Sequence, residues 1–137
     1  MDTLRLPAKI ESLETFRSFV LSRAKERGVP SDILSKIELV LEEILTNIAS
    51  YAYSNEEGSI ELDCLPERSG EFRLRIADWG APFDPLAQED PDLTTDLSER
   101  QIGGLGIYLA RQMADELSYR RENGRNMLHV SFLYGRA

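Results

Sequence analysis

The feature that most restricts the fold is a long amphipathic segment, residues 33–53, which reads ILSKIELVLEEILTNIASYAY. Its apolar side chains recur at steps of three and four residues, which predicts an α-helix with one core-facing stripe. The stripe consists of Ile37, Val40, Leu41, Ile44, Ile48 and Ala52. Glu43 and Asn47 are four residues apart, so they lie one above the other at one border of this stripe. A carboxylate and an amide at the edge of a core can line a pocket.

A second constraint is the glycine segment IGGLGIYLA, which contains Gly103, Gly104 and Gly106 where another helix is expected to begin. A glycine-rich helix start offers free N–H groups and a positive dipole end to a phosphate. A dinucleotide fingerprint is disfavoured, because a polar loop precedes the glycines and Leu109 occupies the third glycine position. The chain also lacks the Gly-Lys-Ser/Thr ending of a P-loop.

The bulk composition narrows the class of protein. The 137 residues suit one domain, residues 1–137, and the formal net charge of −8 argues against a nucleic-acid partner. Cys64 is the only cysteine, which excludes a disulfide framework and a cysteine-rich metal site. His129 is the only histidine, which excludes most zinc sites and any Ser-His-Asp triad built around a second histidine. Cys64 is interpreted as a small core residue and His129 as a surface residue. Neither a signal peptide nor an apolar run near 18 residues is present, so we expect a cytoplasmic protein without membrane association.

The remaining pattern predicts two further helices and five short strands. The helices are expected at residues 9–27 and 105–116, and the strands at residues 3–7, 59–65, 72–76, 117–122 and 126–132. The dipeptide Asn123-Gly124 predicts a two-residue turn between the last two strands. Antiparallel strands with helices grouped between them indicate a two-layer α+β sandwich.

Asp78 is an unusual carboxylate. It shares the parity of Phe72, Leu74 and Ile76, so it points to the apolar side of the sheet, where it is costly without a partner. The polar segment that follows, up to Ile102, has three prolines and no clear period, which is typical of a functional lid.

Together these pieces suit nucleotide binding. Asn47 can hold a magnesium ion, Glu43 can orient or deprotonate a nucleophile, and Asp78 can accept a hydrogen bond from a base amine. Each residue also has a simpler interpretation when taken alone. Glu43 can be a solvated helix residue, Asn47 a tolerated poor helix former, and Asp78 the cap of a turn before Gly80. The glycines can form only a tight turn.

Three segments resemble the motifs of a known superfamily. EEILTN at residues 42–47 resembles the N box of the GHKL ATPases, and DWGAPFDP at residues 78–85 resembles their first glycine box. GGLGI at residues 103–107 resembles their second glycine box. Within the superfamily, the chain is most similar to the small anti-sigma-factor serine kinases that work by partner switching.

The resemblance implies a Bergerat-type sandwich, with a mixed, mainly antiparallel sheet covered on one face by helices. ATP with Mg²⁺ would lie between helices and sheet, beneath a lid at about residues 83–102. By position, Glu43 matches the catalytic carboxylate, Asn47 the magnesium ligand, and Asp78 the adenine-reading aspartate. The other nucleotide-binding positions are Gly80, Gly103, Gly104, Leu105 and Gly106. Pro82 stands where the superfamily has a second glycine, and Asn126 stands near a position where relatives often carry threonine, so no adenine role is carried over to Asn126.

The resemblance also implies partners. Members of this branch phosphorylate a serine of a STAS-domain antagonist, sequester a sigma factor or similar regulator, and often form homodimers. One alternative is a non-catalytic module that holds a regulator in a nucleotide-dependent way. Another, the ATPase half of a histidine kinase, is disfavoured because no predicted helix carries a histidine.

Overall fold

The computed structural model describes residues 2–51, 58–66, 68–82 and 110–134. The chain order begins with β1 (Asp2–Pro7), the short 3-10 helix η1 (Ile10–Ser12), α1 (Leu13–Glu26) and α2 (Ser31–Tyr51). It continues with β2 (Ser59–Cys64), β3 (Glu71–Asp78), β4 (Glu116–Glu122) and β5 (Arg125–Leu133). A short helical segment at residues 110–113 precedes β4.

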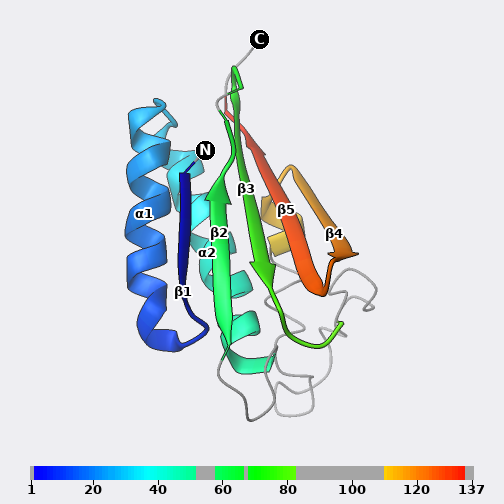
Figure 1. Ribbon diagram of the computed structural model, residues 1–137. Helices are drawn as coiled ribbons and strands as arrows, with labels where there is room; N and C mark the ends of the chain where they lie inside the picture. Colours follow the sequence, from blue (N-terminus) through cyan, green and yellow to red (C-terminus); the bar gives the residue numbers. More distant parts are fainter. Residues whose placement is uncertain (1, 52–57, 67, 83–109, 135–137) are drawn as a thin grey trace, which may run out of the picture.

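The strands form one sheet in the order β1-β2-β3-β5-β4. The resemblance implied a mixed, mainly antiparallel sheet. Among the described strands, every pairing is antiparallel. The chain reverses its direction at each junction along β1, α1, α2 and β2, and these three reversals bring β2 back antiparallel to β1 (Figure 1). Strand β5 lies between β3 and β4, although it follows both of them in the sequence.

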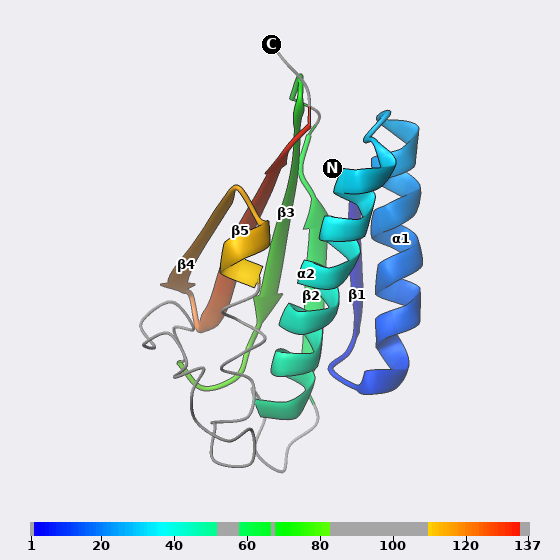
Figure 2. The ribbon, with the colours of Figure 1, turned by 180° about the vertical axis from the view of Figure 1, so that it is seen from behind.

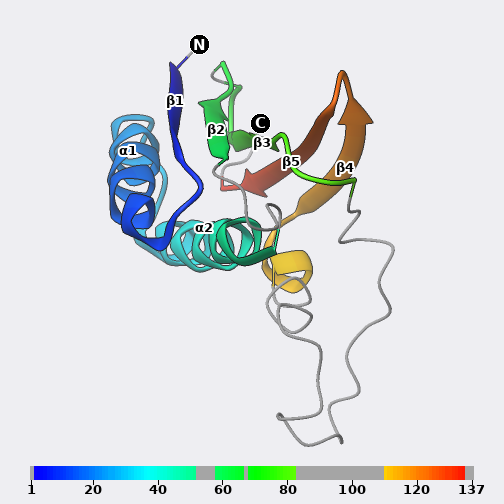
Figure 3. The same cartoon turned by 60° about the horizontal axis from the view of Figure 1, so that its bottom comes forward.

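The helices cover one face of the sheet, which confirms the predicted two-layer α+β sandwich. Figure 2 shows α2 running across this face, with α1 beside it near β1. Figure 3 shows α1, α2 and residues 110–113 on the same side of the strands. Of the described helices, none is long and apolar enough to cross a membrane.

The core lies between this helical layer and the sheet. The predicted stripe of α2 is buried from Ile37 to Ile48, each of its members being at most 5% exposed, while Ala52 lies outside the described residues. It packs with apolar residues of α1 and of the four strands β2 to β5. The buried members from these elements include Phe16, Val20, Ala24, Ile60, Leu62, Cys64, Phe72, Leu74, Ile76, Leu128, Val130 and Phe132.

Several helix boundaries differ from the sequence-based prediction. The helix expected at residues 9–27 is divided into η1 and α1, so its α-helical part begins at Leu13 and ends at Glu26. The start of α2 lies two residues earlier, because the Pro30 carbonyl accepts a hydrogen bond from the Leu34 N–H at 2.9 Å. The predicted extension of a helix to Glu116 is wrong, because Glu116 is the first residue of β4. Asp115 already belongs to the sheet edge, since its N–H donates to the Ser131 carbonyl at 2.9 Å and its carboxylate accepts from the Leu133 N–H at 2.7 Å.

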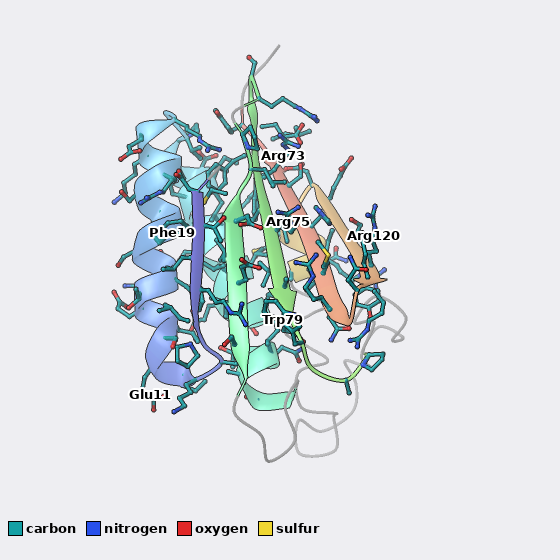
Figure 4. All side chains as sticks on the ribbon, in the orientation of Figure 1. Glu11, Phe19, Arg73, Arg75, Trp79 and Arg120 are labelled. Atoms are coloured by element: carbon teal, nitrogen blue, oxygen red, sulfur yellow. The ribbon has the colours of Figure 1, made fainter. Side chains whose placement is uncertain are left out.

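The other face of the sheet is polar, and no described helix covers it. Figure 4 shows Arg73, Arg75 and Arg120 on this face. Asp63 of β2 also lies on this polar face, but it is only 4% exposed. Arg75 from β3 contacts its carboxylate at 2.7 Å and the Thr3 hydroxyl of β1 donates to it, so neighbouring strands shield it from solvent.

Candidate nucleotide-binding site

The candidate site lies at one end of the sandwich. The carboxyl ends of α2 and β3 lie at this same end of the molecule (Figures 1 and 2). Asp78 is the last residue of β3. Glu43 and Asn47 lie in the second half of α2, and both are partly buried.

Asp78 is buried on the helix-covered side of the sheet, as its parity predicted. It is 5% exposed, and its Oδ1 atom accepts hydrogen bonds from the Gly80 N–H at 2.9 Å and from Asn126 Nδ2 at 3.0 Å. Burial raises the pKa of the Asp78 carboxyl, although the hydrogen bonds from Asn126 and Gly80 and the charge of Arg121 act in the opposite direction. The bond to Gly80 also closes a turn, so Asp78 caps this turn as well as presenting a carboxylate to the interior.

Asn126 is the centre of the polar contacts at this point. Its Nδ2 donates to Asp78 and also to the Ala81 carbonyl at 2.9 Å. Its Oδ1 accepts from the Tyr119 hydroxyl at 2.7 Å and from Arg121 NH1 at 3.2 Å. Arg121 NH1 also donates to the Gly80 carbonyl at 2.8 Å. The β4–β5 hairpin therefore holds both Asp78 and the loop that follows it.

A two-residue turn sets this geometry. Asn123 and Gly124 have φ values of 53° and 75°, the positive values that a tight hairpin requires. In the resulting register Arg121 lies opposite Asn126, and in the neighbouring pair Asp78 lies opposite Asn126. The predicted Asn-Gly turn is confirmed.

Asn126, Tyr119 and Arg121 were not predicted from the sequence to take part in the site. One signal for Asn126 was available, because it shares the parity of the inward residues Leu128 and Val130, as a polar side chain among apolar ones. Tyr119 and Arg121 offered no such signal, because they reach Asn126 from a neighbouring strand.

Glu43 and Asn47 lie where the helical periodicity placed them, at the border of the core. They are partly buried, whereas Ile44 and Ile48 next to them in the sequence are 1% and 5% exposed. An oxygen-bearing pair on one helix edge can contact a ligand without displacing the core stripe.

The other predicted site residues divide into two groups. Gly80 is buried beside Asp78, with its N–H and carbonyl both hydrogen-bonded. The segment Gly103, Gly104, Leu105 and Gly106 and the expected lid at residues 83–102 lie outside the described residues.

Trp79 and the two residues interpreted from the sequence as a core residue and a surface residue, Cys64 and His129, can also be placed. Trp79 packs under Arg5, whose guanidinium lies 4.3 Å from the ring centroid. Cys64 is fully buried, and burial raises the pKa of its thiol to about 11, as suits a core residue. His129 is partly rather than fully exposed, and burial together with the charges of Arg75 and other arginines lowers its pKa.

Comparison with known proteins defines the class that this fold and site represent. Residues 6–132 match the family described as the histidine kinase-like ATPase domain, and the chain belongs to this family. Among its relatives, serine/threonine-protein kinase BtrW of Bordetella bronchiseptica is 38% identical over 96 residues, which are 69% of this chain and 67% of that protein. Serine-protein kinase RsbW of Listeria monocytogenes is 25% identical over 136 residues, covering 96% of this chain and 86% of that protein.

Solved structures share the fold. The RsbU and RsbW domains of Rv1364c from Mycobacterium tuberculosis match with a TM-score of 0.64 at 14% identity. The alignment covers all of this chain but 34% of that one, so this chain spans about a third of its length. The catalytic domain of histidine kinase ThkA matches with a TM-score of 0.57 at 14% identity, covering 98% and 97% of the two chains. The sequence resemblance to the GHKL superfamily and the predicted sandwich are thus confirmed.

Proposed function

We propose that this protein is an ATP-dependent protein serine kinase and anti-sigma regulatory factor. It phosphorylates a STAS-domain antagonist and sequesters a sigma factor or a similar regulator, and it acts as a homodimer. The proposal is supported by the family match over residues 6–132 and by the names of the relatives, which are serine kinases. The observation that carries it is the buried Asp78 carboxylate at the end of β3, at the same end of the molecule as the carboxyl end of α2 with its partly buried pair.

Asp78 supports adenine as the base. The exocyclic amine of adenine is a hydrogen-bond donor, and an inward-facing carboxylate accepts such a donor. Guanine has a carbonyl at that place, which would set an acceptor against the carboxylate and leave both unpaired. The fit of the site to ATP therefore rests on the burial and charge of this one side chain.

The pair on α2 supports phosphoryl transfer. The Glu43 carboxylate orients the substrate serine and takes its proton, while the serine oxygen bonds to the γ-phosphorus and the bond to ADP breaks. Asn47 would hold the magnesium ion, because an amide oxygen is the kind of ligand that this ion prefers. When bound, magnesium neutralises charge on the phosphates. Gly103, Gly104, Leu105 and Gly106 are the proposed backbone cradle for these phosphates.

The test is phosphoryl transfer to a purified STAS-domain protein, with ATP labelled at the γ-phosphate and with magnesium present. We expect label on a serine of the STAS protein, and no label when that serine is replaced by alanine. ATP binding without any transfer would support the non-catalytic binding module instead. Absence of ATP binding would overturn both proposals.

A further inference from the structure

The side-chain amide of Asn126 has one orientation that satisfies its four described hydrogen bonds. Its oxygen faces two donors, the Tyr119 hydroxyl and Arg121 NH1, while its nitrogen faces two acceptors, Asp78 Oδ1 and the Ala81 carbonyl. Turning the amide over would direct its oxygen at a carboxylate and a carbonyl, and its nitrogen at a guanidinium. The hairpin side chains therefore fix which end of the amide meets Asp78.

The amide in turn fixes the Asp78 carboxylate. Both hydrogen bonds from Asn126 and Gly80 end on the same oxygen, Oδ1. This oxygen is held from the β5 side and from the turn after β3, so rotation of the carboxylate would break two bonds in a buried site. The second oxygen, Oδ2, then has a defined direction.

We propose that Asn126 is a positioning residue for adenine recognition, which turns Asp78 Oδ2 toward the base without itself contacting the nucleotide. The inference rests on the proposed function, because it assumes that Asp78 reads the base amine. It adds a role for the β4–β5 hairpin. Its side chains Tyr119 and Arg121 fix the orientation of the Asn126 amide, and this amide fixes the orientation of the Asp78 carboxylate.

The same contacts oppose the effect of burial on the pKa of the Asp78 carboxyl. The hydrogen bond from Asn126 lowers the pKa of the Asp78 carboxyl, and Arg121 is the charged group of β4 that acts in the same direction. A purely structural asparagine would support the loop without any change in this titration. The pH dependence of binding therefore distinguishes positioning from general support.

The experiment compares the unmodified protein with Asn126→Ala and Tyr119→Phe, using a fluorescent ATP analogue with magnesium between pH 5 and 8. Affinity for the analogue should fall as the pH drops through the pKa of Asp78. In Asn126→Ala this fall should occur at higher pH, with affinity at pH 7 weaker by about tenfold or more, the scale of a lost hydrogen bond to a charged group. Tyr119→Phe should move the fall in the same direction by less. Arg120→Gln is the matched control, because Arg120 is an exposed β4 residue whose described ion pair is with Glu122.

A second readout needs no nucleotide. The carboxyl carbon of Asp78, followed by NMR, should titrate at higher pH in Asn126→Ala than in the unmodified protein. If folded Asn126→Ala keeps both the titration midpoint and the affinity of the unmodified protein, the inference is overturned while the proposed function stands. If Asn126→Ala does not fold, an unchanged midpoint in Tyr119→Phe overturns it. If the unmodified protein binds no ATP analogue, the proposed function fails first and the inference with it.

Discussion

At the residue scale, Asp78 combines a stability cost with the adenine-reading role that we propose for it. Because burial raises its pKa above the unfolded value of 3.8, the folded protein binds this proton more tightly than the unfolded chain. The stabilisation linked to this proton is fully present below the unfolded pKa and is lost as the pH rises through the folded pKa. At pH values above the folded pKa, the folded protein therefore carries a buried charge that reduces its stability.

We expect Asp78→Asn to raise the melting temperature at pH 7. The amide oxygen can still accept from Gly80 and Asn126, and the buried charge is gone. The gain should be smaller at pH 4, where a larger fraction of the Asp78 carboxyl is protonated than at pH 7. The same variant should lose ATP affinity, since its amide nitrogen would face the adenine amine. Thermal unfolding at the two pH values checks this, and a lower melting temperature at pH 7 would contradict the argument.

The two polar residues of α2 should separate catalysis from binding. Glu43→Gln keeps size and helix propensity but removes the basic carboxylate, so transfer to the STAS protein should fall about 10²-fold or more while ATP still binds. Asn47→Ala should instead lower magnesium-dependent ATP affinity as well as transfer. Quantitative transfer assays and calorimetry with and without magnesium measure both effects. Wild-type transfer by Glu43→Gln would remove Glu43 from the catalytic role.

At the element scale, α2 is held by its buried stripe. Ile44 is 1% exposed, so Ile44→Ala deletes core contacts and should lower the free energy of unfolding by about 2–5 kcal/mol. Glu42→Ala is the matched control on the same helix. Because Glu42 is exposed, this substitution should change the free energy of unfolding by no more than about 0.5 kcal/mol. Urea unfolding of both variants measures the difference. Equal losses would mean that the stripe does not anchor the helix.

The elements with a local period could be predicted from the sequence. The stripe of α2 and the inward parity of Asp78 follow from spacing alone, since helix and strand repeats are fixed by backbone geometry. The Asn123-Gly124 turn is equally local, because few residues accept its φ values.

The rest of the site depends on contacts between distant strands. Asn126 meets Asp78 only because β5 inserts between β3 and β4, a sheet order that spacing within a strand does not reveal. The burial of Asp63 likewise requires Arg75 from β3, and the early end of the helix before β4 requires the contacts of Asp115 with β5. These features are properties of the pairing, so no single segment encodes them.

At the scale of the whole molecule, the proposed ligand should act as a stabiliser. A nucleotide that binds only the folded protein raises the unfolding free energy by RT ln(1 + [L]/Kd), about 2.7 kcal/mol at one hundred times Kd. We expect ATP with magnesium to raise the melting temperature clearly and GTP at equal concentration to raise it less. Scanning calorimetry compares the two, and Asp78→Asn should lose most of the difference. An equal rise for both nucleotides would contradict the adenine assignment.

The position of β5 in the sheet also determines at what point of synthesis the surroundings of Asp78 can be completed. Strands β1 to β3 and both long helices leave the ribosome well before Arg125, the first residue of β5. Until β5 arrives, β3 has an unpaired edge, and the partner of Asp78 has not yet been made. A nascent chain therefore cannot read a nucleotide through a positioned Asp78. On the proposed function, nucleotide recognition through Asp78 would therefore begin only after nearly all of the described chain has been translated.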